Sequence, residues 1–117
     1  MNSYFAVAIG GAVGATLRFV VSEWAGTPQA TLIVNAVGSL LLGICMAALA
    51  NEMISKEMTL LLGTGILGAF TTMSTFSIET VEMWGDDKTK AAGYVLITMI
   101  LCPLLAYAGW KAIETTA

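Results

Sequence analysis

The sequence is poor in charge, contains no histidine, and has only two cysteines and two prolines. Charged residues make up 11% of its 117 positions, whereas a soluble domain usually carries about a quarter. This shortage excludes a well-hydrated globular surface, and the lack of histidine removes the commonest proton shuttle and metal ligand. Cys45 and Cys102 both fall within apolar runs, so we expect packing residues there rather than a disulfide or a metal pair. The net charge of −3 is too small to indicate a nucleic-acid partner.

The sequence is rich in long apolar runs, and 57% of its residues are hydrophobic. Four runs each reach the roughly 20 residues that an α-helix needs to cross a bilayer, and strands rarely exceed about 10 residues. No Lys or Arg precedes the first run, so we expect a spanning helix there rather than a secretory signal. We therefore predict an all-α, multi-pass membrane protein with one four-helix transmembrane domain over residues 1–117. Its approximate spans are 4–22, 30–50, 58–84 and 91–113.

The basic residues are balanced between the two sides of the predicted bundle. Four spans place both termini and the second loop on one side, together with Lys56 and Lys111. Lys88 and Lys90 lie on the other side, with Arg18 close by. The positive-inside rule therefore gives no preferred orientation. We expect the chain to insert both ways up and to pair as an antiparallel, dual-topology dimer about a twofold axis in the membrane plane.

An unusual cluster of hydroxyl side chains lies in the third run, between residues 68 and 77. Hydrocarbon cannot hydrogen-bond, so such a cluster must face protein, water or an ion. Gly63, Gly65 and Gly68 match the spacing G-x-G-x-x-G, but no predicted strand leads into them, which argues against a nucleotide-binding loop. We expect these glycines to allow close helix packing and the helix to break near its middle, at 68–72. Such a break exposes carbonyls that can bind a cation and a half-helix N-terminus that favours an anion.

Two polar residues in the first two spans each have a structural and a functional interpretation. Arg18 lies just inside the end of the first span, where a charge costs about 2.5–3.5 kcal/mol. It either extends to the nearby interface or places a positive charge in a vestibule that attracts an anion. Asn35 in the second span either holds helices together or donates a hydrogen bond to a dehydrated anion. Gly10 and Gly14, at four-residue spacing with Arg18, predict a close helix-packing surface.

Further candidate residues lie on the third and fourth spans. Met73, Phe76 and Glu79 fall on one helical face of the third span, and Tyr94 and Thr98 form a weakly polar stripe on the fourth. Serine and threonine are plentiful, but an activated nucleophile needs a neighbouring base, and the spans offer none at membrane depth. The sequence therefore predicts that the chain is not an enzyme.

Three motifs occur in order along the chain, one in each of the first three spans. Residues 10–19 read GGAVGATLRF, residues 31–38 read TLIVNAVG, and residues 65–79 read GILGAFTTMSTFSIE. Together they resemble the Fluc (CrcB) family of fluoride channels, whose third-helix pattern is G-x-x-G-x-x-T-T-F-S-T-F-S-x-E. The resemblance covers nearly the whole chain, because the length and the four spans agree as well.

The resemblance implies a passive, fluoride-selective channel in the plasma (cytoplasmic) membrane, formed by an antiparallel dual-topology dimer with two pores. It also implies a structural sodium ion (Na+) at the dimer centre, bound by the backbone carbonyls of Gly68 and Thr71. The implied partners are fluoride, the lipid bilayer and a second subunit, with no nucleic acid. The residues that we expect to line the anion pathway are Arg18, Asn35, Met73, Ser74, Thr75, Phe76, Glu79, Tyr94 and Thr98.

The chain departs from the family pattern at Met73, where the family has a phenylalanine. A phenyl ring offers a positive edge to an anion, whereas a thioether offers a polarizable but weaker contact. Either a homodimer works with this methionine, or a related subunit in a heterodimer supplies the missing ring.

Two other classes are alternatives. A proton-coupled drug exporter of the small multidrug resistance type is also short and four-spanning, but it needs an acidic residue deep in its first helix. This first helix carries Arg18 instead, with Glu23 only at its end. A purely structural membrane scaffold predicts that replacing Asn35 or Phe76 leaves fluoride resistance intact.

Overall fold

The computed structural model describes residues 2–116, and its regular secondary structure over that range is entirely helical. Four helical segments are long and apolar enough to cross a membrane, and three of them are single continuous helices. The prediction of an all-α fold with four spanning helices is therefore confirmed. The continuous helices are α1 (Ser3–Ala25), α2 (Gln29–Ala50) and α6 (Lys88–Glu114).

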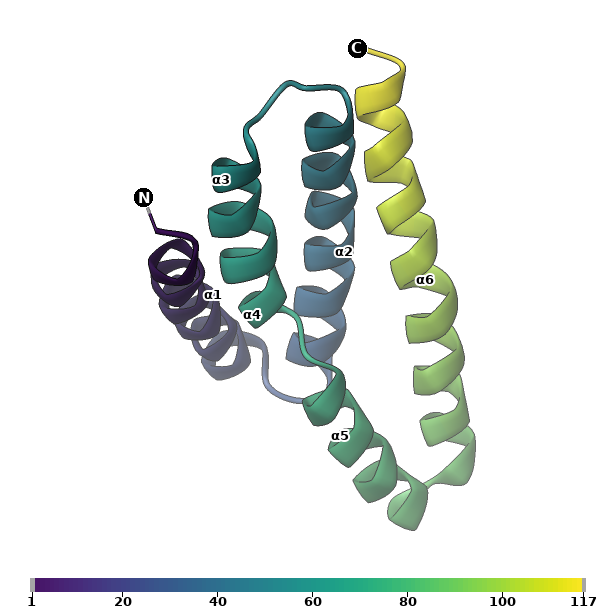
Figure 1. The fold of residues 1–117 in the computed structure, drawn as a ribbon. Coiled ribbons are helices and arrows are strands. Elements are labelled where there is room, and N and C mark those ends of the chain that lie inside the picture. The colour runs from purple at the N-terminus through teal and green to yellow at the C-terminus, as the bar shows by residue number, and fades with distance from the viewer. Residues whose placement is uncertain (1, 117) are drawn as a thin grey trace.

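The third span, Lys56–Asp86, is broken in its middle. Thr71 (φ −85°, ψ 158°) and Thr72 (φ −154°, ψ 120°) have extended backbone, so the helix stops before them and restarts at Met73. In Figure 1 the second half of this span leaves the first half at an angle. The predicted break is confirmed, and Thr71 and Thr72 are its extended residues. The segments of the span are α3 (Lys56–Thr59), the π-helix η1 (Leu60–Leu67), α4 (Gly68–Phe70) and α5 (Met73–Asp86).

Side-chain caps start the third span and α6. Ser55 Oγ accepts a hydrogen bond from Met58 N–H at 3.1 Å before the third span. Asp87 Oδ1 accepts one from Thr89 N–H at 3.0 Å before α6. Both bonds satisfy first-turn N–H groups that have no partner inside a helix. Short loops join the spans, and consecutive spans run in opposite directions (Figure 1).

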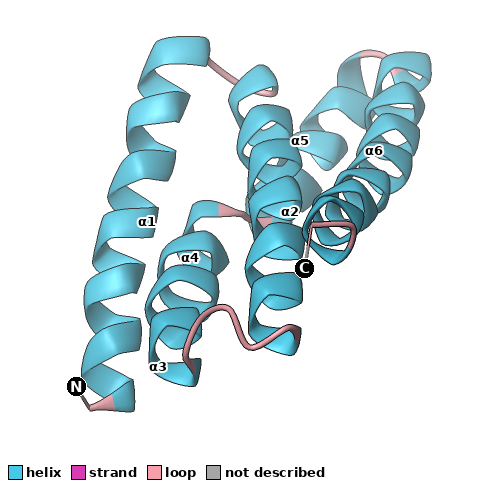
Figure 2. Cartoon of the chain, turned by 90° about the horizontal axis from the view of Figure 1, so that it is seen from above, coloured by secondary structure: helices cyan, strands magenta, loops and turns pink. Residues whose placement is uncertain are grey.

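The first turn of α1, the α2–α3 loop and the last turn of α6 lie at one end of the bundle (Figure 1 and Figure 2). The α1–α2 and α5–α6 turns lie at the other end. Lys56 in α3 and Lys111 in the last turn of α6 therefore lie towards the first end, and Lys88 and Lys90 at the start of α6 towards the second. The balance of basic residues expected from the sequence is kept in the fold.

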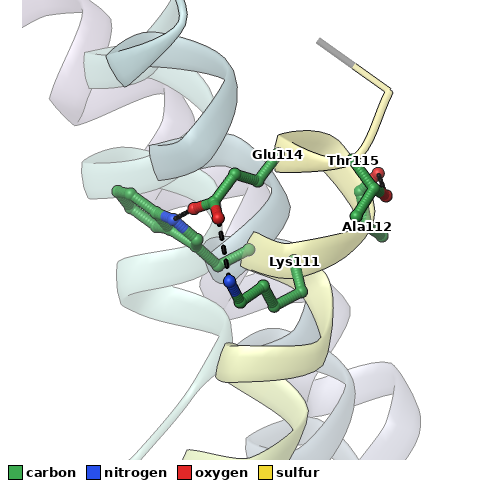
Figure 3. Close-up of polar contacts among 5 residues, drawn as sticks. Lys111, Ala112, Glu114 and Thr115 are labelled. Carbon is green, nitrogen blue, oxygen red and sulfur yellow. Dashed lines mark hydrogen bonds and ion pairs between the residues drawn. The ribbon is translucent and has the colours of Figure 1, made fainter.

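A small polar cluster marks the C-terminal end of α6 (Figure 3). Lys111 Nζ lies 2.9 Å from Glu114 Oε1, and Trp110 Nε1 donates to Glu114 Oε2 at 2.8 Å. Thr115 Oγ1 donates to the backbone oxygen of Ala112 at 3.2 Å. Tryptophan and charged residues at the end of a span are typical of the membrane–water interface. This end of the helix is therefore suited to the headgroup region.

Glycines allow the closest helix crossings. A Cβ added to Gly10 on α1 would lie 2.8 Å from the Cα of Gly65 on η1, closer than real Cβ atoms approach. On the α2–α6 crossing, a Cβ on Gly43 would collide with the backbone oxygen of Ala106. The close-packing role predicted for Gly10 and Gly65 is confirmed. Gly68 differs, because a Cβ there would make only an ordinary contact at 3.5 Å.

Candidate functional site

Asn35 on α2 contacts the break in the third span through its side-chain amide. Thr72 N–H donates to Asn35 Oδ1 at 2.8 Å, and Asn35 Nδ2 donates to the backbone oxygen of Thr72 at 3.1 Å. The extended backbone of Thr72 has no helical partners, and a buried peptide group without partners is costly. Asn35 is itself buried, with 9% of its surface exposed. Its amide therefore acts as the partner that the broken helix lacks.

Arg18 makes a second contact to the break, from α1. Its Nε donates to the backbone oxygen of Ala69 at 3.0 Å. In a continuous helix that oxygen would accept from the N–H of Met73, which now lies beyond the break. Among residues 2–116, Arg18 forms no ion pair, and its terminal guanidinium N–H groups carry no hydrogen bond. The guanidinium of Arg18 therefore faces the break, and its terminal N–H groups remain available as hydrogen-bond donors.

A cavity of about 360 Å³ adjoins Arg18 on the side of α2 and the break. A cation surrounded by hydroxyl groups offers several hydrogen-bond donors to an anion. The cavity could therefore hold a hydrated or partly dehydrated anion. Its hydroxyl-bearing lining residues are Ser22, Thr27, Thr31, Thr72 and Thr75.

The first turn of α5 continues this polar surface. Thr75 N–H donates to Thr72 Oγ1 at 3.2 Å, and Thr72 Oγ1 donates to Thr75 Oγ1 at 3.2 Å. Ser74 Oγ lies 3.5 Å from the same Thr72 oxygen. A second cavity of about 440 Å³ is lined by Ser74, Thr75 and Glu79, and it shares Thr27 and Thr75 with the cavity beside Arg18. The hydroxyl row thus joins two cavities.

A buried polar cluster lies between α5 and α6. Tyr94 hydroxyl donates to Glu79 Oε1 at 2.9 Å, and the rings of Phe76 and Tyr94 pack with centroids 5.1 Å apart at 51°. Glu79 Oε2 and Thr98 Oγ1 are buried without a hydrogen-bond partner in the described part of the chain. Unpartnered buried oxygens are rare in proteins and indicate a water or an ion at the site. Phe76, Glu79 and Tyr94, which the sequence singled out on these two spans, are in contact here.

Met73 lies outside this cluster. It is 63% exposed, whereas Phe76 is 6% exposed. Phe76 and Glu79 contact Tyr94 on α6, whereas Met73 lies one turn nearer the break and is largely exposed, so the expectation that the three share a face stays a prediction. Met73 instead lines a cavity of about 330 Å³ with Asn35 and Thr98. Its exposure also places it on the outer surface of the protomer.

Two backbone oxygens at the break have no partner. Neither the Gly68 oxygen nor the Thr71 oxygen accepts a hydrogen bond within residues 2–116. Carbonyl oxygens of this kind are ligands that hard cations such as sodium prefer. Among the described residues, no group of three or more His, Cys, Asp or Glu side chains could hold a metal ion. The residues present at the break fit a monovalent cation bound by backbone oxygens.

Several contacts at this site could not be predicted from the sequence. The roles of the Ala69 and Thr72 backbone groups depend on where the helix breaks, which residue type alone does not specify. Thr27, shared by two cavities, lies in a short turn with no periodic signal. Thr31 belongs to the motif at residues 31–38, but nothing in that motif marks it as a lining residue of the cavity beside Arg18.

Comparison with known proteins identifies relatives along almost the full chain. The family model described as "CrcB-like protein, Camphor Resistance (CrcB)" matches residues 5–110. A protein of Thermotoga petrophila named "Fluoride-specific ion channel FluC" is 40% identical over 91% of this chain and 90% of its own length. One of Oceanobacillus iheyensis with the same name is 42% identical over 93% and 89%. "Fluoride-specific ion channel FluC 2" of Moorella thermoacetica is 43% identical over 91% and 92%.

Proposed function

The chain belongs to the CrcB-like family, and from that membership we propose that it is a fluoride-selective ion channel through which cytoplasmic fluoride leaves the cell passively. It is a channel and not an enzyme. The observation that carries the proposal is the inward-facing Arg18 at a hydroxyl-lined cavity beside the broken third span. The cellular role is protection from fluoride toxicity at the plasma membrane.

Fluoride is small and strongly hydrated, so a selective path must replace its water with well-placed donors. Arg18 attracts the anion into the cavity, where it and the neighbouring hydroxyl groups raise the local anion concentration. Asn35, Ser74 and Thr75 then donate hydrogen bonds along the row that joins the cavities. Larger halides are excluded because they fit the narrow path poorly and gain less from its donors.

The cluster on α5 and α6 forms the far part of the path. Phe76 offers its ring edge to the anion and Thr98 its hydroxyl group, whereas the one hydroxyl proton of Tyr94 is donated to Glu79, so Tyr94 lines the path with its ring. Glu79 holds Tyr94 in place through the 2.9 Å hydrogen bond. Met73, which stands where the family has a phenylalanine, contributes a weaker contact at its exposed position.

The channel is an antiparallel, dual-topology dimer with two pores. The balance of Lys56 and Lys111 against Lys88 and Lys90 supports insertion in both orientations. Exposed apolar residues such as Met73 leave surface for a partner subunit as well as for lipid. The partner is a second copy, or a related chain in a heterodimer that supplies a ring in place of Met73.

A structural sodium ion lies at the dimer centre, bound by the backbone oxygens of Gly68 and Thr71. Two features support this assignment. Both oxygens lack a hydrogen bond among the described residues. Gly68 is exposed on the protomer, and a Cβ there would meet little, so a partner subunit can approach closely. The ion would stabilise the break in both subunits at once.

A complementation experiment tests this function in cells. Expression of the chain in a bacterium that lacks its own fluoride exporter should restore growth in fluoride-containing medium. The Phe76→Ala variant, produced at the same membrane level, should not. Equal growth with the variant would favour the structural scaffold, and no rescue by the natural chain would oppose the proposed function.

A further inference from the structure

We propose that Asn35 is a positioning residue that sets where α5 begins, and thereby places the hydroxyl row of the anion path. This inference rests on the proposed channel function and deepens it. It assigns to Asn35 a second task besides hydrogen bonding to the anion. The task is carried out through Thr72, with which Asn35 shares two hydrogen bonds.

The side-chain amide of Asn35 matches a peptide group. A carboxamide carries an acceptor and two N–H donors in one plane, and a backbone peptide group likewise carries one acceptor and one N–H donor in one plane. Its oxygen accepts from Thr72 N–H at 2.8 Å and its nitrogen donates to Thr72 O at 3.1 Å, so both polar groups of one residue are satisfied at once. A hydroxyl or an aliphatic side chain at this position could not complete both bonds in the same geometry.

Thr72 links its contact with Asn35 to the first turn of α5. Its hydroxyl oxygen caps the helix by accepting from Thr75 N–H at 3.2 Å, and it lies within 3.5 Å of Ser74 Oγ. The backbone of Thr72 is therefore fixed by α2, while its side chain fixes the first turn of the next helix. Because the hydroxyls of Ser74 and Thr75 extend from that turn, a shift of Thr72 would move both.

The geometry distinguishes this role from a purely anion-binding one. An asparagine that served only the anion would use its N–H groups and leave its oxygen without a specific partner. Here the oxygen accepts the shorter of the two hydrogen bonds, from Thr72 N–H. One N–H of Asn35 remains without a partner among the described residues, and that donor is available to the anion.

Residue-resolved amide hydrogen exchange, measured by NMR on the full chain in lipid nanodiscs, tests the proposal. In the natural chain, Thr72 N–H should exchange much more slowly than Met73 N–H, which has no acceptor among the described residues. Asn35→Leu keeps the shape of asparagine but removes both hydrogen-bonding groups. It should speed exchange at Thr72 and Thr75 by about tenfold or more, and fluoride efflux from the same preparations should fall.

Two further variants distinguish loss of the hydrogen bonds between Asn35 and Thr72 from a general destabilisation of the protein. Asn51→Leu makes the same change at the other end of α2 and should leave both amides and the efflux unchanged. Thr72→Ala keeps the backbone pair but removes the cap, so exchange should rise at Thr75 and not at Thr72. If Asn35→Leu does not fold, Thr72→Ala and the natural chain still show whether the pairing with Asn35 protects the Thr72 amide from exchange.

The proposal is overturned if Thr72 N–H exchanges as fast as Met73 N–H in the natural chain. It is also overturned if Asn35→Leu loses fluoride efflux while Thr72 stays protected, because Asn35 would then act on the anion alone. A natural chain that conducts no fluoride but shows the predicted exchange pattern would count against the proposed function and not against the pairing of Asn35 with Thr72.

Discussion

Tyr94 on α6 donates a hydrogen bond to Glu79 on α5 at 2.9 Å, and this bond ties the half-helix after the break to the last span. The other carboxylate oxygen of Glu79 has no partner within the described residues. The Tyr94 hydroxyl is therefore the one hydrogen-bonding group that the described chain offers to a buried carboxyl group. Loss of this hydrogen bond should lower the stability of the folded protein.

Tyr94→Phe should lower the stability of the folded protein by about 1–3 kcal/mol, the range for leaving a buried polar group without its hydrogen-bond partner. The measurement is thermal unfolding of the purified protein in detergent. Tyr107→Phe is the matched control, because Tyr107 is 62% exposed on the same helix and its hydroxyl has no partner in the described chain. Equal melting temperatures for the two variants would show that the bond to Glu79 contributes nothing.

Gly10→Ala should destabilise the crossing of α1 and η1. The added methyl would lie 2.5 Å from the backbone oxygen of Leu61 and 2.8 Å from the Cα of Gly65, and overpacking of this kind costs about 1–3 kcal/mol. Gly11→Ala is the control, since a Cβ on Gly11 meets nothing within 4 Å. Unfolding in a graded denaturant compares them, and a Gly10→Ala protein as stable as Gly11→Ala would contradict the close approach.

Arg18→Gln should reduce fluoride efflux about fivefold at low fluoride concentration. A unit charge at about 4 Å is worth about 1 kcal/mol even in water, and the partly buried guanidinium acts at a cavity. The loss should shrink as fluoride or salt concentration rises, because screening and saturation both reduce the advantage of the charge. Lys111→Gln, at the far end of α6, should leave the rate unchanged, and an equal fall in both variants would argue against a role specific to Arg18.

Much of this fold follows from the sequence, for physical reasons. The length of the apolar runs requires spanning helices, and the combination of glycine and hydroxyl side chains at 68–72 favours a place where the helix breaks. Thr71 and Thr72 are that place. Gly10 and Gly14 were recognisable as a packing surface because small residues at four-residue spacing leave room for another backbone.

The rest depends on tertiary geometry that no local pattern encodes. The π-helix η1 has the composition of an ordinary apolar helix, so its wider turns could not be predicted. The pairing of Asn35 with Thr72 joins residues from different spans and uses backbone groups. The exposure of Met73 depends on how α5 is rotated after the break, which helical spacing from Phe76 did not reveal.

Met73→Phe should raise fluoride efflux if the chain works as a homodimer. The variant restores the ring that the family has at this position, and a ring edge interacts with an anion more strongly than a thioether. Met58→Phe makes the same change in α3, away from the break, and should have no effect. A Met73→Phe channel slower than the natural one would indicate that the pore is built around the methionine, or that a partner subunit already supplies the ring.

The most direct measurement of the central claim is anion efflux from liposomes that contain only this purified chain. Fluoride release is followed with a fluoride-selective electrode and chloride release with a chloride electrode, under a potassium gradient made permeable by valinomycin. We expect rapid fluoride release, chloride release no faster than from empty liposomes, and loss of the fluoride signal in Phe76→Ala. Fluoride release no faster than from empty liposomes, or chloride release at the same rate as fluoride, would contradict the account.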